Sequence, residues 1–68
     1  MITIEEINTD INKRIKDWKL DNTPATRLVF MEVTKEYMRN SLPDGYVKAD
    51  LIGLIDVEIL KLKNGILN

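Results

Sequence analysis

The side chains in this sequence that could do chemistry are carboxylates, amines, guanidinium groups, hydroxyls and two tyrosines. The 68-residue chain contains no histidine and no cysteine, and Ser41 is its single serine. Histidine is the commonest general acid or base near neutral pH, and nucleophilic catalysis usually places Ser, Cys or Thr beside a base. No candidate base lies near Ser41 in the sequence. We therefore expect a protein that is not an enzyme and needs no cofactor.

Metal binding is also disfavoured by the residue types present. Zinc sites need Cys or His ligands, and neither occurs. Glu32 and Glu36 are four residues apart, so they would share one helical face. Carboxylate metal sites in helical bundles add a Glu-x-x-His motif, which this chain lacks. We expect these two glutamates to lie on a solvated helix face and predict no metal site.

Glu58 is the one acidic residue that falls within an apolar helical seam. It could be a buried acid with a raised pKa, it could form an ion pair, or it could point to water along the edge of the seam. Carboxylates are seldom buried without a partner. Arg27 is the long cation that interrupts the apolar arc of the preceding helix, so we hypothesise an Arg27–Glu58 contact.

Four basic residues gather late in the first predicted helix: Lys13, Arg14, Lys16 and Lys19. Nucleic-acid binding would require them on one side of that helix. Instead they spread around its polar surface and alternate with Asp10, Asp17 and Asp21, and the net charge of the chain is -1. A charged outer surface is the favoured interpretation, and nucleic-acid contact is the alternative.

Short turns between helices also invite comparison with helix-turn-helix proteins. The start of the second helix would then present Thr23, Thr26 and Arg27 to DNA. Glu32 and Glu36 follow on its exposed arc, however, and would repel phosphates. A nucleic-acid-associated regulator is therefore kept as the second hypothesis for function.

Capping signals and apolar periodicity predict a first helix at about 3–19 and a second at about 24–40. Thr3 and Glu6 have the spacing of a capping box, and Thr23 with Pro24 marks the second start. The first helix has one apolar stripe, formed by Ile4, Ile7, Ile11, Ile15 and Trp18. The second is apolar over more than half its circumference: Val29, Phe30, Val33 and Tyr37 share a side that Leu28, Met31 and Met38 extend. We expect it to be buried on two sides or against a partner.

The third helix is predicted at about 47–63. One face carries Val47, Leu51, Leu54, Ile55 and Leu62, with Ile52 and Ile59 beside it. Asn64-Gly65 should end the helix, after which Ile66 would fold back onto Leu60. A strand over residues 55–59 followed by an Asn-Gly hairpin is the alternative, although only three residues follow that turn.

Together these elements predict a small all-α domain of three helices with short connections, spanning residues 1–68 as a single domain. Without cysteine, packing alone or packing with oligomerisation must stabilise it. The start of the chain lacks the features of a signal peptide, and the longest apolar run, 51–55, is too short to span a membrane. We expect a cytoplasmic protein with no membrane contact.

Four side chains are candidates for a protein interface: Val57, Leu60, Tyr37 and Tyr46. Val57 and Leu60 project away from the seam of the third helix, and tyrosine is enriched at interaction hot spots. Ile66, Leu67 and the first helix could instead cover them within one chain. The first hypothesis is a small regulatory or adaptor module that docks an apolar helix face on a larger protein or, as a homo-oligomer, on itself.

Overall fold

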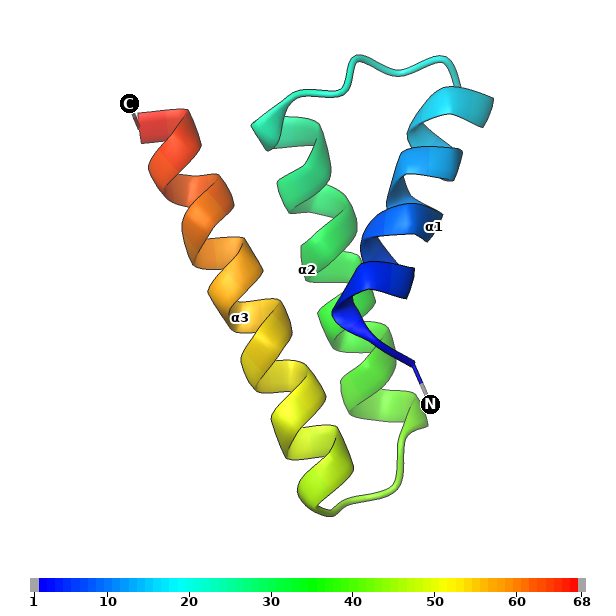
Figure 1. The fold of residues 1–68 in the computed structure, drawn as a ribbon, viewed down its shortest axis with the longest axis vertical. Coiled ribbons are helices and arrows are strands. Elements are labelled where there is room, and N and C mark those ends of the chain that lie inside the picture. Colours follow the sequence, from blue (N-terminus) through cyan, green and yellow to red (C-terminus); the bar gives the residue numbers. More distant parts are fainter. Residues whose placement is uncertain (1, 68) are drawn as a thin grey trace.

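Three helices arranged up, down and up make the fold (Figure 1). The computed structural model describes residues 2–67, with side chains from Ile2 to Ile66. Helix α1 spans Ile4–Asp17, α2 spans Pro24–Ser41 and α3 spans Tyr46–Leu67. Residues 2–67 contain no β-strand, so the all-α prediction is confirmed and the hairpin alternative for residues 55–66 is wrong.

The first two helices begin where their capping residues predicted. The Glu6 amide donates to Thr3 Oγ1 over 3.1 Å at the start of α1. The Thr26 amide donates to Thr23 Oγ1 over 3.2 Å at the start of α2, with Pro24 in the first turn. Each threonine thus satisfies one amide that has no partner inside its helix.

Helix α1 ends in a motif that the sequence did not reveal. Lys19 adopts a left-handed backbone with φ 55°. Its amide donates to the Lys16 carbonyl over 3.1 Å, and the Leu20 amide donates to the Ile15 carbonyl over 2.9 Å. These two bonds define a Schellman motif, which usually has glycine at the left-handed position. Lysine occupies it here, so the sequence carries no glycine signal for the helix end, which lies at Asp17 and not near residue 19 as expected.

Helix α3 starts one residue early and continues past its predicted stop. Gly45, with φ 153°, precedes the helix, and its carbonyl accepts the Ala49 amide over 3.1 Å. At the other end Gly65 remains helical, so the predicted glycine stop and the return of Ile66 are wrong. A Cβ at Gly65 would lie 3.7 Å from Pro24 Cγ. The end of α3 therefore lies close to the start of α2.

The core lies where the three helices meet, and it consists of eight buried apolar side chains: Ile7, Ile11, Ile15, Met31, Met38, Leu51, Ile55 and Ile59. The α1 stripe is confirmed for its three central isoleucines. The row on α3 is rotated from the predicted seam, because Ile59 is buried whereas Val47 and Leu54 are exposed. This rotation decides which face of α3 remains open to solvent.

The backbones of α2 and α3 run antiparallel and close together, whereas α1 approaches this pair mainly through its side chains. Lys35 Nζ of α2 lies 2.7 Å from Asp56 Oδ1 of α3 and links the two helices. No helix among the described residues is both long enough and apolar enough to cross a membrane.

Candidate interaction surfaces

The two glutamates considered for metal binding lie on the exposed surface of α2. Glu36 Oε1 is 3.0 Å from Arg39 Nη1, one turn further along the same helix, and Glu32 is also exposed. Within residues 2–67 no three side chains of the metal-binding types come together. The arrangement offers ordinary surface ion pairing, which contributes little to stability.

Arg27 and Glu58 do not form the ion pair that we hypothesised. The Arg27 guanidinium donates to Asn8 Oδ1 over 2.6 Å and also to Asn12 Oδ1, both on α1. Glu58 is partly buried, and its Oε1 lies 3.7 Å from Lys61 Nζ on its own helix. Arg27 faces α1 because α2 turns Met31 toward the core; its side chain therefore joins α1 to α2 and does not reach α3.

The four basic residues at the end of α1 do not gather into one patch. All four are exposed, and Arg14 Nε pairs with Asp10 Oδ2 at 3.1 Å. At 100° per residue, Lys13, Arg14 and Lys16 cover about 160° of the helix surface. Lys19 lies beyond the helix in the Schellman turn. A duplex lying on any one line of approach would meet only part of this charge.

Val57, Leu60 and Tyr46 occupy the solvent side of α3, opposite Ile55. Tyr46 is 91% exposed, Leu60 is 60% exposed and Val57 is 49% exposed. The alternative in which Ile66 and α1 cover these side chains is wrong, because the three remain exposed and Ile66 continues the helix; the side chain of Leu67 lies outside the described residues. We call this the α3 outer face and define it by five residues: Tyr46, Ala49, Gly53, Val57 and Leu60.

Tyr37 belongs to a different surface. It is 64% exposed and follows Val29 and Val33 along one line of α2 at intervals of four residues. We call these three residues the α2 outer face. Burial of Val29 and Val33 between the other two helices is wrong, because α2 turns Met31 and Met38 to the core and leaves the two valines outside; their burial against a partner stays a prediction. The four predicted interface residues thus divide between two faces.

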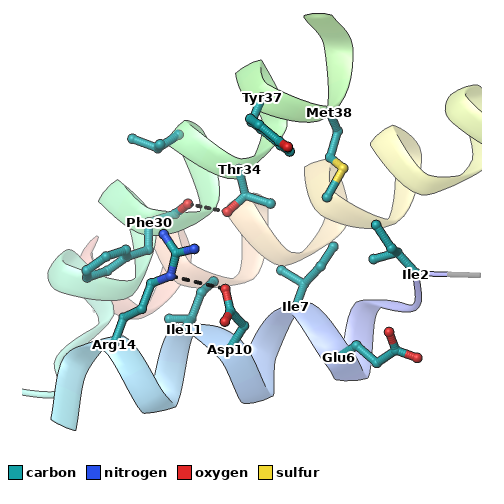
Figure 2. A pocket seen from close by; sticks show the side chains of 11 residues that line it. Ile2, Glu6, Ile7, Asp10, Ile11, Arg14, Phe30, Thr34, Tyr37 and Met38 are labelled. Atoms are coloured by element: carbon teal, nitrogen blue, oxygen red, sulfur yellow. Dashed lines mark hydrogen bonds and ion pairs between the residues drawn. The ribbon is translucent and has the colours of Figure 1, made fainter. Parts of the chain in front are cut away.

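An apolar hollow of about 510 Å³ lies between α1 and α2 beside the α2 outer face (Figure 2). Ile7, Ile11 and Met38 line it, and Phe30, Val33 and Tyr37 belong to its α2 side. Some of its polar side chains already have partners: Arg14 pairs with Asp10, and the Thr34 hydroxyl donates to the Phe30 carbonyl over 2.8 Å, whereas Glu6 lines the hollow from α1 as a carboxylate. The hollow therefore offers mainly apolar contact.

Trp18 and Ile2 are also exposed, and neither exposure was predicted. Trp18 was expected in the core, but it is 61% exposed, because α1 ends one residue before it and takes it off the isoleucine stripe. Its ring lies 5.5 Å from that of Phe30, in a tilted arrangement. Ile2 is exposed at the hollow beside α1. The only sign in the sequence that apolar side chains near Trp18 and Ile2 would be exposed is the broad apolar arc of α2.

Comparison of the chain with protein-family models, with curated proteins and with solved structures finds no significant match.

Proposed function

We propose that this protein is a non-enzymatic interaction module, a small regulatory or adaptor protein that docks an apolar helix face on a second copy or on a larger protein. The observation that carries the proposal is the exposure of two apolar rows on different sides of the α2–α3 pair. Val33 on α2 and Val57 on α3 are each about half exposed or more, in the middle of regular helices. Contiguous apolar rows of this kind mark interaction sites more often than isolated exposed side chains do.

The chemistry of the surface supports docking. Tyr37 and Tyr46 each present a large rigid ring with one polar atom, and such side chains are favoured at interaction hot spots. Arg14 and Asp10, which line the hollow, are already paired with each other, so a partner that covers them leaves neither of these two charges unpaired. A cytoplasmic location is part of the proposal, since a chain without cysteine gains nothing from an oxidising compartment.

The test compares three tagged variants with the wild type, each added to a lysate of the organism that encodes the protein. Val33→Lys with Tyr37→Lys blocks the α2 outer face, and Val57→Lys with Leu60→Lys blocks the α3 outer face. Thr9→Lys with Ser41→Lys adds the same two charges at exposed polar positions and serves as the matched control. Circular dichroism checks that all four proteins keep their helicity.

Recovery of one distinct protein, or of an untagged copy, by the wild type and the control but not by one of the surface variants supports the proposal. Recovery that is equal for all four proteins, or that is absent for the wild type, overturns it. A catch that disappears with nuclease would instead support the nucleic-acid alternative and direct attention to Lys13, Arg14, Lys16 and Lys19.

A further inference from the structure

We propose that the α3 outer face binds the same face of a second copy, with the two α3 helices antiparallel about a two-fold axis. The inference rests on the proposed function and names its partner. Along α3 the five residues of this face recur every three or four positions, so they form one straight row on the helix. Large and small side chains are both present in the row, and Leu54 flanks it, about half exposed.

Gly53 is the centre of this row and has no structural reason within one chain. It lies in the middle of α3, where glycine is a less favourable helix residue than alanine. A Cβ built at this position meets no atom within 4 Å. No neighbour among the described residues therefore requires the side chain to be missing. Glycine in a helix face permits a second backbone or a bulky side chain to approach closely, and here that space faces solvent.

Charge selects the register of the second copy. Asp50 and Lys61 lie on the same flank of the row, about three turns apart, and both are exposed. In an antiparallel pair, residues on one flank meet residues on the same flank of the other copy. Placing Asp50 against Lys61 of the second copy also places Lys61 against Asp50 of that copy. The two-fold axis thus makes two oppositely charged contacts from one match.

The same register matches the sizes of the facing side chains. Val57 falls opposite Gly53 of the second copy, and Leu60 falls opposite Ala49 of that copy. Each large side chain meets a small one, which is the condition for close packing of two helices. A parallel pair would set Gly53 against Gly53, which leaves a gap between the helices, and Leu60 against Leu60, which crowds two large side chains together. The antiparallel pair also opposes the two helix dipoles.

The other flank of the α3 row carries Asp56, which in this register lies close to Asp56 of the second copy. Its carboxylate is held 2.7 Å from Lys35 Nζ of α2, and this ion pair compensates its charge. On the α2 outer face an antiparallel self-pair would bring Glu32 toward Glu36 of the second copy, and of these two glutamates only Glu36 has an ion-pair partner, Arg39, among the described residues. Like charges in that position oppose association. Self-association is therefore assigned to α3 and not to α2.

Sedimentation equilibrium of the full chain tests the register by charge reversal. We expect the wild type to dimerise. Asp50→Lys alone and Lys61→Asp alone each set like charges together twice, so each should weaken dimerisation by about tenfold or more. Asp50→Lys combined with Lys61→Asp restores both opposite contacts and should return the dissociation constant to within about threefold of wild type, allowing for context. A wild type that stays monomeric, or a double variant no tighter than the singles, overturns the inference.

Gly53→Leu provides a second, independent readout. Leucine favours helix more than glycine does, and a Cβ at this position has no described atom within 4 Å, so we expect the monomer to stay folded. The bulky side chain fills the space assigned to Val57 of the second copy, and we expect the dimer to be lost. Thr9→Leu adds the same side chain at an exposed position of α1 and should leave the dimer intact. Unchanged dimerisation of Gly53→Leu would overturn the inference.

Failure of the dimer proposal and failure of the proposed docking function give different results. A monomeric wild type that still recovers a distinct host protein, and loses it when Val57 and Leu60 are replaced by lysine, removes the second copy but retains the docking function. A monomeric wild type that recovers nothing removes both.

Discussion

Arg27 of α2 donates a 2.6 Å hydrogen bond to the side-chain oxygen of Asn8 in α1. Asn12, one turn further along α1, accepts a second bond from the same guanidinium. Few other polar contacts join α1 to the rest of the described chain, so this fork orients α1 on α2. Arginine suits the position because its planar group presents several donors in a fixed geometry.

Replacing Arg27 with Met should therefore destabilise the fold by about 1–2 kcal/mol, since two charge-assisted hydrogen bonds are lost while the length of the side chain is kept. Urea unfolding followed by circular dichroism measures the change. Arg39→Met on the same helix removes an exposed pair with Glu36 and should change the stability by less than about 0.5 kcal/mol. Equal effects of the two substitutions would show that the fork contributes nothing specific.

Lys19→Gly should stabilise the protein by about 1 kcal/mol. Lysine at φ 55° bears a steric cost from its Cβ that glycine does not. Lys16→Gly is the matched control, because it makes the same chemical change inside the last turn of α1 and should destabilise by a similar amount. Thermal unfolding of both variants gives the signs directly. A loss of stability in Lys19→Gly would contradict the Schellman geometry.

Gly53→Ala should raise the stability of the monomer by about 0.5–1 kcal/mol, because the added methyl group meets no neighbour and alanine is the better helix former. Denaturation at a protein concentration below that of self-association isolates this effect. Gly45→Ala is expected to act in the opposite direction, since Gly45 has φ 153°, a conformation unfavourable for alanine. A destabilised Gly53→Ala would mean that some group in the chain occupies the space beside Gly53.

The pKa of Asp44 lies below its ordinary value, because the Lys48 ammonium donates a 2.9 Å hydrogen bond to its carboxylate and attracts its charge. Carboxyl chemical shifts followed by NMR over an acid titration should show this low pKa. In Lys48→Met the pKa should rise back toward the ordinary aspartate value.

The sign of the stability effect follows from this direction. Because the pKa is lower in the folded chain, the contact contributes stability above the unfolded pKa, and that contribution disappears as the pH falls through the folded pKa. The difference in the free energy of unfolding between the wild type and Lys48→Met should therefore shrink as the pH falls below about 4. A difference that grows in acid would contradict the pairing.

Sequence alone predicted the parts of this fold that depend on neighbours along the chain. Thr3 and Thr23 cap their helices through amides three residues away, so the spacing carries the whole signal. The α1 isoleucines were predictable for a similar reason, since a single narrow stripe leaves no choice of face.

The side of α2 that faces the core could not be predicted. The side with Met31 and Met38 and the side with Val29 and Val33 are both apolar, and periodicity does not choose between them. Position in space made the choice: Met31 is buried and Val33 is exposed. The helix stop predicted at Gly65 was wrong for a related reason. A glycine stop signal uses only neighbours along the chain, whereas Pro24, which lies beside Gly65 in space, is far from it in the sequence. The interface candidates on α3 were located by their position opposite the seam, and only their exposure needed the structure.

Helix α1 is attached to the α2–α3 pair mainly by side chains, and this has a consequence for how the molecule opens. The α2–α3 pair joins neighbours in sequence through a short turn, so it can form early and persist while α1 is undocked. Detachment of α1 would uncover Met31 and Ile55, the most deeply buried side chains of the other two helices. Such a partly opened state would present more apolar surface to a partner than the closed state does.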